Sequence, residues 1–274
     1  MPRHFRHGAD HRALLGKEGL DAVLDCGLLR TPYAEVVHHG AKLPQEEYCE
    51  ARQIRAVRAD GFVAPDRVRA LLDDGATLVL PRTDQWHGAT AELAAAYTAH
   101  TGRRTYAYSF FTRDGAPGVD VHRDDSDVIM IQTAGSKHWK VYEPPVDGDW
   151  GEGPTRDPGQ LVLEIELRAG EALYVPRGCA HAGVGGSTFS GHLSLTLPQP
   201  GLMELRQGLV RLLSTTGREL PPRPVGRAAM REAAHRLLAD ARDRLDALTP
   251  EDLLAQAERE QARREAGRRR GSAP

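Results

Sequence analysis

Residues 119–145 read VDVHRDDSDVIMIQTAGSKHWKVYEPP, and the interpretation of the whole sequence starts from this stretch. One histidine and three carboxylates come directly before the apolar run 128–131. His122 and Asp124 lie two residues apart on a segment predicted to be extended, so strand alternation places both side chains on the same face. The stretch therefore predicts a polar site at the beginning of a buried strand.

The residue types in this site are typical of a metal centre. Two imidazoles and one carboxylate can hold a redox-active cation such as Fe(II) on one side and leave three coordination positions open. The second imidazole must come from a distant strand. His181 in YVPRGCAHAG is the best candidate, because Pro176 and Gly178 turn the chain just after an apolar strand. His192 in GHLSLTL is the alternative third ligand, or a residue that contacts the ligands or a substrate.

Three neighbouring residues compete with this ligand set. Asp125 is expected to point to the opposite face by alternation, and Asp127 is expected to cap or orient the turn into VIMIQT. Cys179, two residues before His181, can be a soft ligand, but we interpret it as a small buried residue. A His-x-Asp pair alone is a weak signal, because the sequence contains 12 histidines.

A lysine in the next strand strengthens the prediction of a functional site. In SKHWKVY, alternation places Lys137, Trp139 and Val141 on one face. Because two of these three residues are apolar, Lys137 is predicted to point into the protein. A buried ammonium group is costly unless an anion pairs with it. The anion is either a nearby carboxylate of the protein or a bound dicarboxylate with its other end at the metal.

The composition is typical of a globular protein and excludes several classes. Of the 274 residues, 40% are hydrophobic and 27% are charged, with a formal net charge of −2. The three cysteines match no zinc pattern and predict no disulfide framework. No apolar stretch resembles a signal peptide or reaches the roughly 20 residues of a membrane helix, so a cytoplasmic protein without a membrane partner is expected. With 5% aromatic residues, nucleic acid is not an expected partner.

The distribution of apolar residues predicts a mainly β protein with flanking helices. Gly, Pro, Asp and Ser separate short apolar segments between residues 104 and 198, which is typical of a β-sandwich or barrel. The predicted strands are 76–82, 105–112, 127–133, 138–144, 161–167, 171–176 and 192–198, and the predicted helices nearby are 65–75 and 89–102. Residues 1–60 are expected to be a mostly helical and irregular lead-in with one extended piece at 33–40, and residues 61–198 the catalytic core.

The end of the sequence is predicted to be helical. Residues 199–262 contain two amphipathic segments and then Thr249, which is expected to cap a last helix. One apolar stripe comprises Met230, Ala234, Leu237, Ala241, Leu245 and Leu248. This stripe packs either on a second subunit or on the protein's own core. Residues 263–274 are expected to be a disordered basic tail.

Three blocks of sequence, in this order, resemble a known family: VHRDDSDVIMIQTAGSKHWKVYEPP, GEALYVPRGCAHAG and GHLSLTL. They are similar to the JmjC-type, cupin-fold oxygenases that depend on Fe(II) and 2-oxoglutarate, in particular to the bacterial branch similar to ribosomal-protein hydroxylases. The resemblance covers residues 28–198 and implies a double-stranded β-helix core. It also implies that His122, Asp124 and His181 ligate Fe(II). Lys137 would pair with the distal carboxylate of 2-oxoglutarate, and O2 would be the second co-substrate.

The sequence also departs from this family. Relatives carry proline before the first ligand, where this chain has Val121, and asparagine and tyrosine where it has Tyr108 and Phe110. Tyr108 can still offer a hydroxyl group to 2-oxoglutarate, and Thr112 and His192 are further candidates. Relatives that modify ribosomes extend into a winged-helix domain after the helical segment, so a ribosomal substrate is not carried over to this chain.

Three functions agree with these observations. The leading one is an oxygenase that hydroxylates a protein or peptide side chain, as a homodimer formed through the helical segment, which pairs subunits in the family. The second is a tailoring hydroxylase of a free amino acid, a small peptide or a natural product. The third is a cupin-like binding or regulatory protein without turnover. The inward lysine and the His-x-Asp pair favour an oxygenase over this third class.

Overall fold

The computed structural model describes residues 1–113, 118, 120–214 and 223–271, with the side chains of residues 187, 188 and 265–271 left aside. The chain forms two compact units, Met1–Pro198 and Gln199–Pro274. None of the helices among the described residues is long and apolar enough to cross a membrane.

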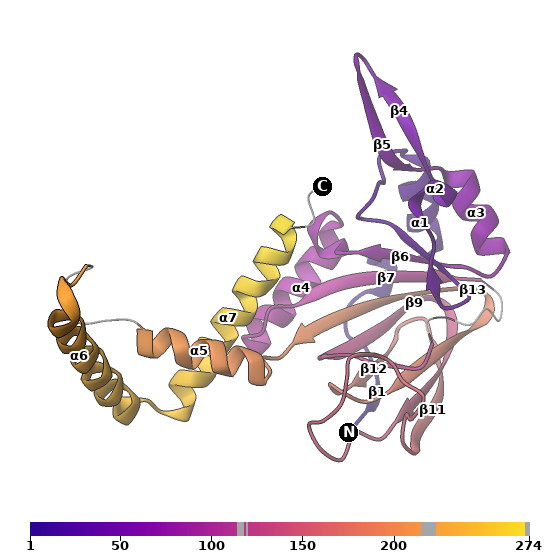
Figure 1. Ribbon diagram of the computed structural model, residues 1–274. Coiled ribbons are helices and arrows are strands. Elements are labelled where there is room, and N and C mark those ends of the chain that lie inside the picture. The colour runs from indigo at the N-terminus through magenta and orange to yellow at the C-terminus, as the bar shows by residue number, and fades with distance from the viewer. Residues whose placement is uncertain (114–117, 119, 215–222, 272–274) are drawn as a thin grey trace. The chain divides into compact units, whose positions relative to one another are not determined.

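The first unit is built on an antiparallel sheet that curls on itself and contains, among the described residues, eleven strands (Figure 1). These strands are β1 (Arg3–Arg6), β2 (Glu35–His38), β3 (Ala41–Lys42), β6 (Thr77–Pro81), β7 (Tyr106–Thr112), β8 (His122–Arg123), β9 (Ser126–Tyr142), β10 (Gly153–Pro154), β11 (Leu161–Arg168), β12 (Glu171–Val175) and β13 (His181–Pro198). The hydrogen-bonded order is β1-β12-β9-β13-β7-β6-β2-β3; β11 pairs with β9, and β8 pairs with β13 and β10. The predicted mainly β, double-stranded β-helix class is confirmed.

Both faces of the sheet are covered, which explains the continuous apolar run at 128–131. Val128 and Met130 point inward and belong to a buried cluster shared with β11 and β12. Ile129 and Ile131 point outward and pack in a second cluster with Ala94 of α4 (Gly88–Thr101). The metal-site segment therefore leads into a strand held by apolar contacts on two sides.

Two strands of the structure are longer than the segments that were predicted. The strands predicted at 127–133 and 138–144 are one strand, β9, because Gly135 adopts a φ of +59° and lets the ladder continue through the bend. The strand predicted at 192–198 is the second half of β13, which begins at His181. The first half of β13 is rich in glycine and has no apolar alternation that could have revealed it.

The lead-in 1–60 contains more strand than was predicted. It includes α1 (Lys17–Asp25), α2 (Gln45–Tyr48) and the short 3-10 helix η1 (His11–Ala13), and the extended piece predicted at 33–40 is β2. The strands that were not predicted are β1, β3, β4 (Cys49–Ile54) and the start of β5 (Val57–Val63). The β4–β5 hairpin projects away from the curled sheet (Figure 1). Its outer half is exposed on both faces, so it lacks the half-buried alternation that predicts a strand.

The two helices that precede β7 were predicted correctly. α3 (Pro65–Asp73) begins with a proline in its first turn, and the positive φ of Gly75 follows its end. α4 ends at Gly102, whose φ is +69°. Helices α1 and α3 pack through their buried leucines and valines on β6 and β7, and η2 (Thr83–Gln85) connects β6 to α4.

Among its described residues, the second unit consists of α5 (Leu202–Ser214), α6 (Gly226–Ala247) and α7 (Pro250–Gly271). The expected cap of the last helix is present: Thr249 Oγ1 accepts from the Asp252 backbone N–H, and the Asp252 carboxylate accepts from Thr249. Helix α7 continues to Gly271, whereas a disordered tail was predicted from residue 263. Its alanine, arginine, glutamate and glutamine are good helix formers, and residues 272–274 lie outside the described residues.

Candidate metal centre

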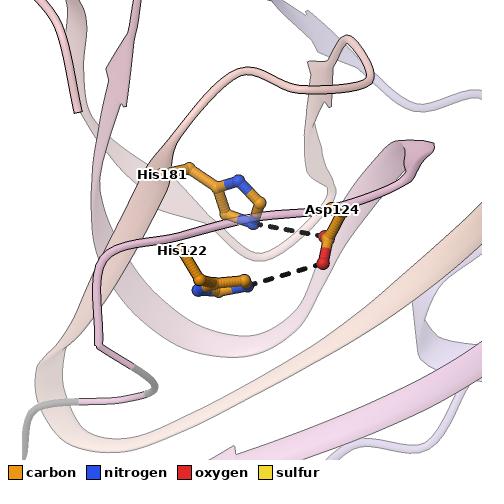
Figure 2. Close-up of side chains that lie close together, drawn as sticks. All are labelled: His122, Asp124 and His181. Atoms are coloured by element: carbon orange, nitrogen blue, oxygen red, sulfur yellow. Dashed lines mark ion pairs between the residues drawn. The ribbon is translucent and has the colours of Figure 1, made fainter. Parts of the chain in front are cut away.

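Three side chains from two separate segments meet at one end of the curled sheet. His122 lies on β8 and is the register partner of His181, the first residue of β13. The carboxylate of Asp124 accepts contacts from both rings: Oδ1 lies 3.8 Å from His122 Nε2, and Oδ2 lies 3.5 Å from His181 Nε2. Figure 2 shows both imidazoles directed at this carboxylate. The three ligand atoms lie within 4.8 Å of one another, the only such group of three among the described residues.

Backbone contacts orient both histidines for metal binding. His122 Nδ1 lies 2.7 Å from the Asp120 carbonyl oxygen, and His181 Nδ1 lies 3.1 Å from the Cys179 carbonyl oxygen. A ring that donates its Nδ1–H to a carbonyl group keeps Nε2 unprotonated and free to coordinate. Both Nε2 atoms therefore present a lone pair on the side of Asp124. Two imidazoles and one carboxylate in this arrangement fit Fe(II).

Burial favours the neutral form of His181, which is the form that binds metal. The side chain is 2% exposed. Burial and the neighbouring His122 lower the pKa of His181 to about 4, while Asp124 opposes this shift. At neutral pH the ring is therefore an uncharged ligand, whereas a protonated ring would repel a cation.

The three side chains face a cavity of about 300 Å³ inside the curled sheet. Its lining combines apolar side chains with hydroxyl groups, one ammonium group and an acidic residue at its edge. The lining residues are Thr77, Tyr108, Phe110, His122, Asp124, Ser126, Val128, Met130, Lys137, Trp139, Glu152, His181, Gly183, His192, Ser194 and Thr196. The volume is at the lower end of the range for small-molecule sites.

Lys137 lies in the cavity wall, as the alternation of SKHWKVY predicted. It is 3% exposed, and its Nζ lies 5.2 Å from the centre of the Trp139 ring. Burial lowers the pKa of Lys137 to about 8. Gly183 makes room for it, because a Cβ at that position would lie 2.7 Å from Lys137 Cε. Among the described residues, no carboxylate forms an ion pair with Lys137, and burial is the cause of its lowered pKa.

His192 lines the same cavity but does not join the group of three. Its ring stacks on Phe110 at 4.8 Å and meets Trp139 edge to face at 5.2 Å. It is 3% exposed, and its Nδ1 atom is buried without a partner in the part of the chain described. Burial, followed by Lys137 and His181, holds the pKa of His192 well below its usual range. Of the two histidines considered as third ligand, the structure places His181 beside Asp124 and His192 deeper in the cavity.

The two hydroxyl candidates on β7 differ in position. Tyr108 lines the cavity, and burial raises the pKa of its phenol. Thr112 is 1% exposed and is not among the residues that line the cavity. It pairs with Ser190 and with Thr77, and Thr77 does line the cavity, so a contact from Thr112 to 2-oxoglutarate stays a prediction.

The three residues that were considered as alternative metal ligands, Asp125, Asp127 and Cys179, lie in other surroundings. Asp125 binds Arg177, and Asp127 binds Arg103 and the Tyr174 hydroxyl group. Cys179 is 1% exposed, and burial raises the pKa of its thiol.

Sequence reasoning missed Glu152 at the cavity edge. It lies in the polar loop 148–160, which has no periodicity that predicts where its side chains point.

Comparison with known proteins agrees with this geometry. Residues 83–205 match the family model of the JmjC domain. The chain is 28% identical over 152 residues to ribosomal oxygenase 1 of Gallus gallus, which covers 53% of this chain and 25% of that protein. It is 34% identical over 92 residues to the bifunctional lysine-specific demethylase and histidyl-hydroxylase NO66 of Drosophila erecta, covering 31% of this chain and 14% of that protein. The chain thus spans about a quarter or less of the length of these relatives.

Solved structures support the same fold. YcfD, a ribosomal oxygenase from Escherichia coli solved in complex with cobalt and 2-oxoglutarate, aligns with a TM-score of 0.54 at 18% identity. The alignment covers 92% of this chain and 64% of that one. At this identity the likeness concerns the fold. The match to the JmjC domain model, the curled sheet and the convergence of His122, Asp124 and His181 agree with one another: residues 83–205 are similar to a JmjC domain.

Proposed function

We propose that this chain is an Fe(II)- and 2-oxoglutarate-dependent oxygenase. The observation that carries the proposal is the pairing of two features in one cavity: a group of His122, Asp124 and His181, and a buried Lys137 with no carboxylate partner among the described residues. A dicarboxylate with one end at the metal and the other at Lys137 satisfies both. This arrangement also disfavours the non-catalytic cupin alternative, which has no need for a costly buried ammonium group.

Several residues that line the cavity have a defined role in this proposal. When bound, Fe(II) supplies the redox chemistry by which O2 couples decarboxylation of 2-oxoglutarate to hydroxylation of a substrate C–H bond. His122 and His181 hold their protons on Nδ1 and offer Nε2 to the metal. Lys137 orients the co-substrate through its distal carboxylate. Val128 and Met130 line the cavity with apolar surface, which limits the access of water.

The substrate that we propose is a side chain of a protein or peptide. The cavity of about 300 Å³ must hold 2-oxoglutarate and the reacting group together, so it leaves room for one slender group. The relatives named ribosomal oxygenase 1 and histidyl-hydroxylase also favour a protein substrate. A free amino acid, small peptide or natural product is the second candidate, because a cavity of about 300 Å³ also falls within the range of small-molecule sites.

We further propose that the protein is cytoplasmic and forms a homodimer through its helical segment. The support for the dimer is the exposure of the apolar stripe on α6: Met230, Leu237 and Leu245 are 56%, 45% and 52% exposed within this chain. Apolar side chains gathered on one helical face are typical of an interface.

The proposal is tested by binding and by turnover. Anaerobic addition of Fe(II) and 2-oxoglutarate is expected to produce a weak visible charge-transfer band, which is lost in the His122→Ala variant. Succinate should then form when peptide, ribosomal or small-molecule pools are added in air, and mass spectrometry should find an added oxygen in the product. A folded, metal-loaded wild type without the band would contradict the proposal.

A further inference from the structure

The segment 122–127 uses its two faces for different contacts. Its even-numbered ligands point to the metal centre, as alternation predicts. Its odd-numbered residues point away from the metal and bind the loop 176–181, which leads to His181. These residues are Arg123, Asp125 and Asp127. The two ligand-bearing segments are therefore tied together behind the site as well as in it.

Arg123, the residue between the first two ligands, makes the most buried of these contacts. It is 8% exposed, although arginine is rarely buried without partners. Its Nη1 donates to the Gly178 carbonyl oxygen at 2.5 Å, and its Nη2 donates to the carbonyl oxygens of Asp157 and Pro158 at 3.1 and 3.2 Å. One guanidinium group thus holds the loop that carries His181 and the loop 155–160 together.

Two further contacts fix the position of Gly178: a backbone hydrogen bond and the packing of the Trp150 ring. The Gly178 N–H donates to the Asp124 carbonyl oxygen at 3.0 Å, so Gly178 is bonded to two consecutive residues of the ligand segment. Its φ of +79° and its position against the Trp150 ring, 3.0 Å from where a Cβ would be, require glycine. The backbone conformation at Gly178 is therefore fixed, and so is the direction of the carbonyl group that Arg123 binds.

Asp125 and Asp127 hold the preceding residue of the same loop. Asp125 Oδ1 accepts from Arg177 Nε at 2.7 Å and lies 2.5 Å from its Nη2. Asp127 Oδ1 accepts from the Arg177 backbone N–H at 2.9 Å. The loop is thus fastened at two consecutive positions, Arg177 and Gly178.

We propose that Arg123 is a positioning residue of the metal centre, which sets the orientation of His181 through the Gly178–Cys179 backbone. His181 is the first residue of β13, and just before it the Ala180 carbonyl oxygen accepts from the Tyr142 N–H of β9, so the hydrogen bond of Arg123 to Gly178 lies immediately upstream of the point where the sheet begins to hold this chain. The orientation of its ring depends on the Cys179 carbonyl oxygen, which follows directly after the Gly178 carbonyl group that Arg123 binds. This inference rests on the metal site of the proposed function and not on its turnover.

The test uses Co(II) as a spectroscopic probe of ligand geometry in the full chain. Arg123→Met is expected to weaken Co(II) binding about 10- to 100-fold, the range observed when a group that orients a metal ligand is removed. The substitution should also change the visible absorption spectrum of bound Co(II). In the metal-free protein, hydrogen exchange of the Gly178 amide should become faster, whereas the exchange rates of amides in β9 and β11 should stay the same. Arg123→Lys, which keeps the charge but cannot reach three carbonyl groups together, should fall between wild type and Arg123→Met.

Arg52→Met is the matched control. Arg52 also binds backbone carbonyl groups of distant segments, those of Gly27 and Val63, but it lies on β4, away from the metal centre. The Arg52→Met substitution should lower the thermal stability of the protein and leave its affinity for Co(II) unchanged.

The possible results separate the two proposals. A wild type that does not bind Co(II) contradicts the proposed metal site itself. A wild type and an Arg123→Met variant with equal affinity and equal spectra contradict the positioning role. If Arg123→Met does not fold, Asp125→Asn decides, because it loosens Arg177 at a partly exposed position; unchanged Co(II) affinity there overturns the inference.

Discussion

His181 Nε2 lies 3.5 Å from Asp124 Oδ2, although β9, β10, β11 and β12 separate the two residues in the sequence. The contact depends on the pairing of β13 with β8, where His181 stands opposite His122. Without a cation, this geometry brings two imidazole lone pairs and a carboxylate close together. With a cation, the same geometry provides three ligands on one side of it.

Replacement of Asp124 should remove metal binding. Asp124→Ala deletes the carboxylate that both imidazoles contact, so Fe(II) or Co(II) affinity should fall at least 100-fold, which titration calorimetry would measure. Asp125→Ala is the neighbouring control: it keeps all three ligands and should show a smaller loss, transmitted through Arg177. An equal loss in both variants would mean that the ligand set is different.

Lys137→Met should stabilise the metal-free protein while abolishing 2-oxoglutarate binding. The pKa of Lys137 falls from 10.5 to about 8 on folding, so at neutral pH the fold carries a buried charge that costs on the order of 3 kcal/mol. Methionine has a similar shape and removes this cost. Chemical denaturation at neutral pH would measure the gain.

Lys140→Met is the control for this substitution. Lys140 lies on the same strand, but its side chain is 48% exposed, so the change in the free energy of unfolding should be within about 0.5 kcal/mol. A wild type that is more stable than Lys137→Met would show that Lys137 has an anionic partner in the protein.

The affinity for 2-oxoglutarate should depend on pH through the same lysine. Lys137 is charged below its pKa of about 8, and only the ammonium form attracts the distal carboxylate. Binding to the Co(II)-loaded protein should therefore be strongest below about pH 8 and should weaken by up to about tenfold for each further pH unit. Lys137→Arg keeps its charge over this range, so any binding it retains should not change with pH.

The stability of the metal-free wild type should rise with pH, whereas its affinity for 2-oxoglutarate falls. Because the pKa is lower in the folded state, the unfolded chain binds more protons between about pH 8 and pH 10.5, and stability rises with pH in this window. The contribution should be absent in Lys137→Met. Denaturation curves at several pH values, recorded for both proteins, would measure this change in the free energy of unfolding.

A charge in the apolar stripe of α6 should prevent dimer formation. Leu237 is 45% exposed within the chain, so Leu237→Glu should not disturb the fold of one subunit but should place a carboxylate in the proposed interface. Light scattering should report a monomer for Leu237→Glu and a dimer for wild type. Arg231→Glu, an exposed substitution beside the stripe on the same helix, should leave the dimer intact. A monomeric wild type would contradict the interface.

Local sequence patterns predicted the parts of this protein that depend on neighbouring residues. Alternation placed His122 and Asp124 on one face and Lys137 on the inner face of its strand, because side chains of a strand alternate whatever the strand pairs with. The capping box at Thr249 and the glycine after α4 follow from short-range hydrogen bonds and from permitted backbone angles.

Other features were decided only by pairing between distant segments. The register of β13 against β8 brings His181 rather than His192 to Asp124, and the register of β13 against β7 places His192 against Phe110. Long-range pairing also joined two predicted strands into β9. The loop around Arg177 and Gly178 is bonded to the ligand segment because Arg123 and Asp125 reach it in space. The sequence alone therefore determined which side chains share a face, whereas strand register in the tertiary structure decided which faces meet, because hydrogen bonds between distant strands leave no local periodicity in the chain.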